Sequence, residues 1–206
     1  MAGFAASGSV LRRYTCNARG RVSPVAMIDG QMNLQKLQTF SDGDTFHVVI
    51  ESPRGSSLKL KYVPDWEAMG ISRPLPAGLV FPFDWGFIPS TCGPDGDPVD
   101  VFVVWDVAAF PGVVVACRAI GVLNAEQNAV NFDHSKRIRN DRVVAVPVEG
   151  RRERTVRKLE DIPERLRDEW IQFSIASAAL DGKDMTPLGW GSAEDALALI
   201  NASRQQ

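Results

Sequence analysis

Three aspartates lie within six residues of one another, at Asp95, Asp97 and Asp100. Carboxylate oxygens are hard ligands that suit Mg²⁺ or Mn²⁺, and crowded carboxylates repel each other unless a cation lies among them. Gly96 lets the backbone bend so that the side chains can converge, and Pro98 fixes the turn. The run therefore indicates a divalent-metal site.

Two other interpretations of this run need to be weighed. Asp, Gly and Pro are the commonest turn residues, so a plain turn leading into a strand stays open on spacing alone. A calcium loop of the EF-hand type requires a glycine at its sixth position and a distant glutamate. This run has a different spacing and lacks flanking helices, which disfavours the calcium loop.

The elements that must position these aspartates are mostly short strands. Runs rich in β-branched or alternating residues cover 45–51, 58–63, 101–105, 113–123 and 142–148. Turn-forming residues separate them, at 52–57, at Pro111-Gly112 and over 124–140. Short strands at this spacing, without an intervening helical pattern, predict a small barrel.

Helical patterns follow the strands. Asp161 and Glu164 have the spacing of a capping box, with apolar residues at helical spacing after them and Gly182 as a stop. A second helix is expected from Ser192, with Asp195 three residues on. The predicted fold class is α+β, mainly β: a small five-stranded OB-like closed barrel with flanking C-terminal helices.

The composition of the 206-residue chain suits one domain, with residues 1–40 as a variable or poorly ordered extension and 41–206 as the folded part. A net charge of −2 disfavours wholesale nucleic-acid binding. Arg12-Arg13 is a twin-arginine pair, but no apolar run follows it, which argues against an export signal. No segment has the ~20 apolar residues of a membrane span. Three cysteines without CxxC spacing favour a reduced, cytoplasmic protein.

The central segment closely resembles the family I soluble inorganic pyrophosphatases. It carries their D-x-D-P-x-D signature at 95–100, preceded by the aromatic and proline stretch Phe81–Ile88. The resemblance runs from about residue 48 to about residue 200, through Arg142–Pro147 and Gly189-Trp190, and covers three-quarters of the chain in order. Residues 41–206 are thus expected to form an inorganic pyrophosphatase-like domain.

The resemblance implies Mg²⁺-dependent hydrolysis of inorganic pyrophosphate to two phosphates, with Mn²⁺ as a possible substitute. Asp95, Asp97 and Asp100 would hold the metals, and Asp97 would also help to deprotonate the attacking water. Metal coordination lowers the pKa of bound water far below ~15.7, so that hydroxide can form near neutral pH. A homo-oligomer is implied as well, and neither nucleic acid nor membrane is an expected partner.

Further residues carry over from the family by position. The nearest candidates for two more metal ligands are Glu126 and the pair Asn140-Asp141, of which Asp141 is favoured because it directly precedes Arg142; an insertion separates Leu123 from Arg142. The expected substrate-binding residues are Glu51, Lys59, Lys61, Arg73, Trp85 and Arg142, the last of these where the family has a lysine. Taken singly, each of the cations would be a solvated surface charge.

This chain departs from the family pattern around the departing phosphate. Lys61 stands where the family has a glutamate, and Phe81 and Trp85 stand where it has tyrosines. A late Tyr-Lys pair of the family falls at Ala176-Ser177. The metal-binding half of the site is therefore expected to be kept, and the phosphate-binding half to be remodelled.

Two alternative functions remain open. An apolar wall of Phe81 and Trp85 would suit a larger phosphoanhydride, such as one that carries a nucleoside. A catalytically weak OB-like barrel would instead bind phosphate or an oligonucleotide, with the basic run Arg151–Arg154 as a contact. Three clustered aspartates argue against the second alternative, because they repel phosphate unless metal is present.

Overall fold

The computed structural model describes residues 14–16, 22–24, 33–129, 136–179 and 181–205. It divides the chain into two compact units, Met1–Met32 and Asn33–Gln206. In the first unit, β1 (Tyr14–Cys16) pairs antiparallel with β2 (Val22–Pro24). Most of the predicted extension, including Arg12-Arg13, lies outside the described residues, so the domain boundary at residue 40 stays a prediction.

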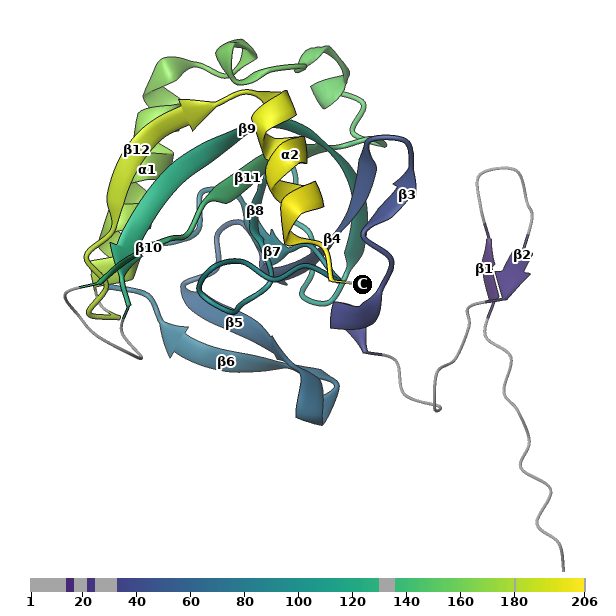
Figure 1. Cartoon of the computed structure of the whole chain (residues 1–206), viewed down its shortest axis with the longest axis horizontal. Helices are drawn as coiled ribbons and strands as arrows, with labels where there is room; N and C mark the ends of the chain where they lie inside the picture. Colours follow the sequence, from purple (N-terminus) through teal and green to yellow (C-terminus); the bar gives the residue numbers. More distant parts are fainter. Residues whose placement is uncertain (1–13, 17–21, 25–32, 130–135, 180, 206) are drawn as a thin grey trace, which may run out of the picture. The chain divides into compact units, whose positions relative to one another are not determined.

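The second unit is built around five strands that close into a ring, as predicted (Figure 1). These are β4 (Thr45–Ser52), β7 (Asp84–Phe87), β8 (Asp100–Val103), β9 (Val114–Asn128) and β11 (Arg142–Pro147). Their order is β9-β11-β8-β7-β4, and β4 pairs again with β9 to close the ring. The pair of β11 and β8 is parallel, and the other four pairs are antiparallel.

Three short strands extend this barrel. They are β3 (Phe40–Asp42), which pairs with β4, and β10 (Arg137–Arg139) and β12 (Thr186–Gly191), which both pair with β9. The chain just before β3 already belongs to the compact unit, with a 3-10 turn at Leu34–Lys36 and a buried Thr39 whose hydroxyl donates to Pro89 O at 3.0 Å.

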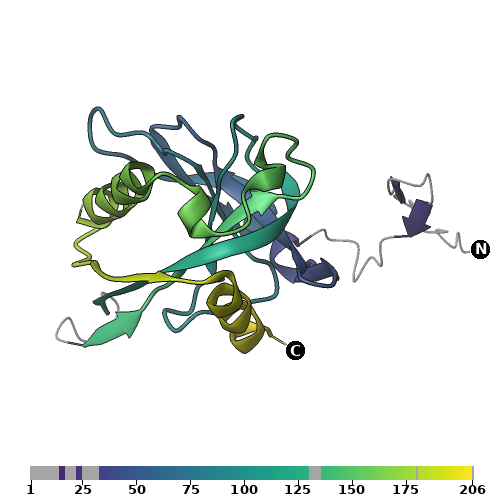
Figure 2. The same cartoon turned by 90° about the horizontal axis from the view of Figure 1, so that it is seen from above.

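Successive side chains of the barrel strands enter two different cores, because a strand alternates its faces. Val101 and Val103 of β8 pack with Ile200 of the last helix, α2 (Ala193–Ser203). Phe102, between them, packs with Phe173 of α1 (Glu164–Ala179). Figure 2 shows the two helices on different sides of the barrel strands. Neither these helices nor the 3-10 turns of the described residues are long and apolar enough to cross a membrane.

The two predicted helix starts have different outcomes. Ser192 caps α2 as expected, with Asp195 N donating to its hydroxyl at 3.2 Å and Ser192 N donating to Asp195 Oδ2 at 2.8 Å. Asp161 instead caps the 3-10 turn Leu159–Asp161, where its Oδ2 accepts from Arg157 N and Lys158 N. Pro163 pushes Ile162 into extended backbone, so the turn ends there and α1 begins at Glu164.

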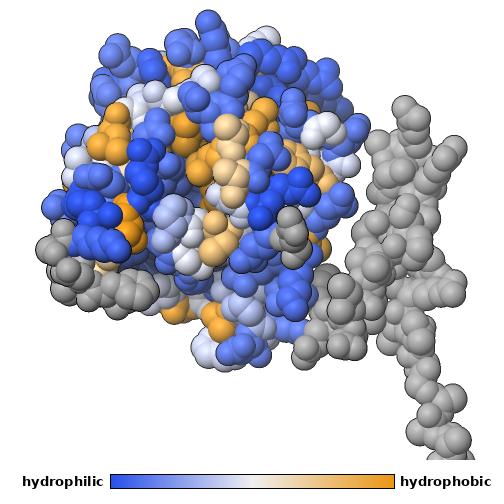
Figure 3. Space-filling view, viewed as in Figure 1, coloured by the Kyte–Doolittle hydropathy of each residue, from blue (hydrophilic) through white to orange (hydrophobic). Residues whose placement is uncertain are grey.

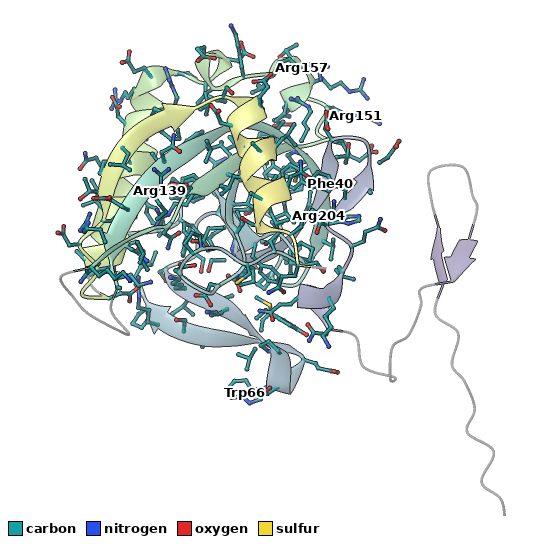
Figure 4. The ribbon with its side chains drawn as sticks, viewed as in Figure 1. Phe40, Trp66, Arg139, Arg151, Arg157 and Arg204 are labelled. Carbon is teal, nitrogen blue, oxygen red and sulfur yellow. The ribbon has the colours of Figure 1, made fainter. Side chains whose placement is uncertain are left out.

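A separate hairpin stands beside the barrel. It consists of β5 (Leu58–Val63) and β6 (Ala68–Pro74), joined by the 3-10 turn Pro64–Trp66. Sequence alone predicted β5 but not β6, because β6 has no alternation of apolar and polar residues. Figure 4 shows Trp66 at the tip, where its side chain is exposed. The hairpin places Lys59 directly opposite Arg73.

The surface drawn in Figure 3 is predominantly hydrophilic over the described residues, with hydrophobic side chains in small separate groups.

A further 3-10 turn at Glu153–Thr155 precedes α1, and its buried Glu153 accepts from Asp106 N at 3.1 Å.

Candidate active site

Asp95 and Asp97 lie in a tight loop that leads into β8. The loop is closed by Gly93 N, which donates to Asp97 O at 2.7 Å, and by Asp97 N, which donates to Asp95 Oδ1 at 3.2 Å. Gly96 has a φ of 86°, a left-handed conformation that favours glycine. The loop is thus an Asx-type turn, and the same turn brings the carboxylates toward the start of the strand.

Asp100 is the first residue of β8, and the sheet register sets Arg142 beside it. The parallel pairing of β8 with β11 aligns these two residues. Burial raises the pKa of Asp100 to about 6, although Arg142 and Lys59 act in the opposite direction. Arg142 is buried, its Nη1 donates to Asn140 O at 2.7 Å, and its Nε has no hydrogen-bond partner among the described residues.

Glu51 lies near the end of β4 and holds the hairpin against the barrel. Its Oε1 accepts a hydrogen bond from Tyr62 N at 2.8 Å, and its side chain is buried. Burial raises the pKa of Glu51 to about 7, with the charge of Asp100 adding to the rise and Lys61 and Lys59 opposing it. Glu51 therefore belongs to the same electrostatic cluster as the aspartate loop.

The hairpin carries the predicted cations to opposite parts of this cluster. Lys61 Nζ lies 2.9 Å from Asp97 Oδ1. Lys59 Nζ lies 5.8 Å from the centre of the Trp85 ring and 3.9 Å from Asp181 Oδ2. Arg73 forms an ion pair with the same Asp181.

A small cleft lies beside these groups. Of the predicted site residues, Lys59, Trp85, Asp100 and Arg142 line it. Its walls also hold Gln127, Asp181 and Lys183, which the sequence did not indicate. Asn140, next to the candidate Asp141, and Ser177, where the family's Tyr-Lys pair falls, line it as well. A smaller neighbouring hollow is lined by Asp95 and Asp141 and shares Asp100 and Asn140 with the cleft.

The two further carboxylates expected as metal ligands point to arginines. Glu126 Oε1 accepts from Arg137 Nε at 3.0 Å, and Asp141 accepts from both Arg139 and Ala125 N. Figure 4 shows Arg139 beside the strands β9 and β10. The structure does not bring Glu126 to the aspartate loop, while Asp141 reaches the smaller hollow, so the ligand roles of both stay predictions.

Amide side chains face the aspartates instead. Strand alternation turns Gln127 to the face opposite Glu126, where Gln127 is buried and its Oε1 has no hydrogen-bond partner among the described residues. Asn140 Nδ2 donates to Asp95 Oδ2 at 2.8 Å. Each amide is next in sequence to a predicted carboxylate. For Gln127, which lies in β9, a one-residue shift in strand phase was the signal that could have found it.

The donor set fits a divalent cation in its chemistry. Burial raises the pKa of Glu51, Asp95 and Asp100, so their ionised forms lack sufficient compensating charge. Within the described ranges, no three His, Cys, Asp or Glu side chains are already gathered around one metal position. Metal binding at Asp97 would therefore require this carboxylate to leave Lys61.

Of the two aromatic substitutions, only Trp85 reaches the cleft. Phe81 is buried, with its ring centre 5.0 Å from that of Phe173 in α1. Trp85 packs against Phe81 at 6.1 Å and against Phe102 at 5.4 Å between ring centres. The apolar wall expected from Phe81 and Trp85 is thus formed by the Trp85 indole beneath Lys59 together with Phe173 and Ala178 of α1, and Phe81 is not part of it.

Comparison with known proteins agrees with this architecture. Residues 48–206 match the family model described as inorganic pyrophosphatase. The inorganic pyrophosphatase of Thermus thermophilus is 35% identical over 162 residues, which is 77% of this chain and 88% of the relative. That of Nostoc is 31% identical over 172 residues, covering 84% of this chain and 97% of the relative.

Solved structures show the same likeness. The crystal structure of inorganic pyrophosphatase from Thermus thermophilus superposes with a TM-score of 0.76 at 34% identity, over 84% of this chain and 97% of that one. The structure from Coxiella burnetii gives 0.72 at 31% identity, over 81% and 97%. This chain belongs to the family I soluble inorganic pyrophosphatases.

Proposed function

We propose that the cleft hydrolyses inorganic pyrophosphate to two phosphates, with Mg²⁺ held by Asp95, Asp97 and Asp100. The observation that carries this proposal is the pairing of Asp100 with Arg142 at the start of two parallel strands. It sets Asp100, which ends the acidic loop, beside Arg142 and Lys59 in the cleft, while Asp95 lines the neighbouring hollow that shares Asp100. Metal and phosphate can then be held side by side. The names of the relatives support pyrophosphate as the substrate.

Bound Mg²⁺ supplies a lowered pKa for the attacking water and neutralises charge on the departing phosphate. Asp97 is about half exposed, so its carboxylate can exchange Lys61 for a ligand and accept a proton from water. The family's metal dependence agrees with this donor set, and hard oxygen donors suit both Mg²⁺ and Mn²⁺.

The cationic side chains Arg142, Lys59, Arg73 and Lys61 bind and orient the phosphates. Arg142 is buried, and its Nε has no hydrogen-bond partner in the part of the chain that the structure describes. A guanidinium can hold phosphate with two parallel hydrogen bonds. Lys59 and Arg73 supply two further positive charges, and Lys61 a third. Glu51 orients the hairpin that carries them through its bond to Tyr62 N.

Phosphate release from pyrophosphate in Mg²⁺ tests this function. Asp97→Asn is expected to lower the rate about 10²- to 10⁴-fold, the usual contribution of a general base. Asp65→Asn, at an exposed carboxylate in the hairpin turn, is the matched control and should keep the wild-type rate. Equal rates for the wild type and Asp97→Asn would reject the proposal.

Substrate choice is tested in the same assay with ATP in place of pyrophosphate. Because Phe81 is buried and four charged side chains and Arg142 line the cleft beside Trp85 and Phe173, we propose that pyrophosphate is preferred over a nucleoside anhydride. Faster phosphate release from ATP would favour the larger phosphoanhydride. In the basic run, Arg152 is paired with Asp106, and nothing in its geometry favours nucleic-acid binding.

Cytoplasmic location and homo-oligomer formation are part of the same proposal. Cys92 and Cys117 are free thiols, which suits a reducing compartment. Sedimentation of the purified full chain would report the oligomeric state.

A further inference from the structure

Two of the phosphate-binding cations share one carboxylate that no sequence motif indicated. Lys59 and Arg73 are directly opposite each other in the hairpin, so their side chains can reach one anion. The anion that they meet is Asp181, which follows the end of α1. It lies 108 positions from Arg73 in the sequence, so only the tertiary fold brings these groups together.

The contact with Arg73 involves both oxygens of the carboxylate. Arg73 Nη2 donates to Asp181 Oδ2 at 3.0 Å, and Arg73 Nε forms an ion pair with Asp181 Oδ1. Lys59 Nζ lies 3.9 Å from Oδ2. The three side chains are only 16–26% exposed, so solvent screens these charges less than it screens a surface pair.

Arg73 also has a neutral anchor that does not depend on Asp181. Its Nη2 donates to Ser177 O at 2.7 Å and to Ser177 Oγ at 3.2 Å. These bonds hold the guanidinium near the end of α1. Loss of the Asp181 charge would therefore leave Arg73 in place, with its Nε, which has no hydrogen-bond partner among the described residues, open to another anion.

A phosphate group would use the same donors as Asp181. Guanidinium binds carboxylate and phosphate with the same two-bond geometry, and the negative charge of Asp181 cancels part of the attraction that Lys59 and Arg73 exert on an incoming anion. Asp181 also lines the cleft together with Lys59. A phosphate in this part of the cleft must displace the carboxylate or bind beside it.

We propose that Asp181 is an internal competitor that sets the affinity of the cleft for phosphate groups, and so determines how tightly the substrate and the product are held. This inference rests on the proposed function only in taking phosphate groups as the ligands. Asp181 acts through Lys59 and Arg73, and it is a positioning residue rather than a catalytic one.

Calorimetric titration of the metal-free full chain with inorganic phosphate tests the inference. Asp181→Asn keeps the size and one acceptor oxygen but removes the charge. It is expected to bind phosphate about tenfold more tightly than the wild type, because the charge-assisted bonds from Lys59 and Arg73 to Asp181 no longer compete with those to phosphate. Asp184→Asn is the matched control, because Asp184 is an exposed carboxylate three residues on that pairs with Arg137. Its phosphate affinity should be unchanged.

Equal or weaker phosphate binding by Asp181→Asn would overturn the inference. Asp181→Ser serves the same comparison if the asparagine variant does not fold. Ser177→Ala separates charge from local structure, because it disturbs the same junction without removing a negative charge. Tighter phosphate binding by Ser177→Ala to the same degree would show a structural effect and also overturn the inference.

Turnover gives a second readout. With Mg²⁺, Asp181→Asn is expected to lower KM for pyrophosphate without a rise in kcat, since both substrate and product are held more tightly; a raised KM would contradict the inference. If the wild type releases no phosphate from pyrophosphate, the proposed function fails, while the comparison of phosphate affinities still decides the role of Asp181.

Discussion

Lys61 Nζ lies 2.9 Å from Asp97 Oδ1, so a lysine is ion-paired with the carboxylate that is proposed to take the proton of the attacking water. Both side chains are about half exposed, and a pair of this kind contributes about 0–1 kcal/mol to stability. The pair can therefore open readily. The pair matters for metal binding, because Lys61 and a divalent cation would compete for the carboxylate of Asp97.

Lys61→Gln is expected to raise the affinity of the protein for Mn²⁺ severalfold, since an ion pair of up to about 1 kcal/mol no longer has to be broken. The unfolding free energy should change by less than about 1 kcal/mol. Mn²⁺ titration followed by electron paramagnetic resonance measures the affinity. Lys36→Gln, at an exposed lysine in the first 3-10 turn, is the control, and weaker Mn²⁺ binding by Lys61→Gln would contradict the prediction.

Stability of the metal-free protein should fall as pH rises through the range in which Glu51 loses its proton. Burial raises the pKa of Glu51 from 4.5 to about 7, so the folded state binds the proton more tightly than the unfolded state. The resulting stabilisation is fully present below pH 4.5 and is lost by about pH 7. The shift corresponds to about 3 kcal/mol.

Glu51→Gln isolates this effect, because glutamine keeps an acceptor for Tyr62 N and cannot ionise. The difference in unfolding free energy between the variant and the wild type should shift in favour of the variant by about 3 kcal/mol between pH 4.5 and pH 7.5. The charge of Asp100 adds to the Glu51 shift, so the difference between the two proteins includes the coupling of these two carboxylates. Urea unfolding in the presence of a chelator measures the difference, and parallel pH profiles would refute the assignment.

Gly86 is required where β7 pairs with β4. A Cβ at this position would overlap Val49 O, and both contacting segments are buried barrel backbone that cannot shift locally. Gly86→Ala is expected to cost about 3 kcal/mol or more in unfolding free energy. Gly43→Ala is the comparison, since that site has open space and only a positive φ of 53°, and it should cost about 1 kcal/mol. Similar urea midpoints for the two variants would contradict the argument.

The barrel could be predicted from the sequence because each of its strands has its own local signal. β-branched runs such as 45–51 and 142–148 are bounded by turn residues, and the D-x-D-P-x-D run identified the start of β8. The hairpin strand β6 carries no such pattern, since its residues are largely exposed on both faces. It is held by pairing with β5 and by the bond between Glu51 and Tyr62 N, which are tertiary effects.

The site was predictable only where chemistry and motif coincide. Asp95, Asp97, Asp100 and Arg142 come together because the parallel pairing of β8 and β11 places a recognised motif beside a recognised cation. Asp181 carries no local signal, because its partners come from a hairpin far away in the sequence.

Gln127 offers the sharpest test of which side of β9 faces the metal. Its side chain is 2% exposed, its Oε1 has no hydrogen-bond partner among the described residues, and it lines the cleft with Asp100. Gln127→Glu would place another carboxylate there. In the metal-free protein this buried charge should lower the unfolding free energy by about 2–4 kcal/mol, because it is desolvated near Asp100.

Added Mg²⁺ should restore that loss, since a divalent cation compensates the new charge and stabilises the folded state by mass action. The thermal midpoint of Gln127→Glu is therefore expected to rise more steeply with Mg²⁺ concentration than that of the wild type. Glu126→Gln is the matched control, because Glu126 pairs with Arg137 on the other face of the strand, and its Mg²⁺ dependence should equal that of the wild type. If Glu126→Gln weakened the Mg²⁺ response and Gln127→Glu left it unchanged, Glu126 would be the ligand and the strand phase argued here would be wrong.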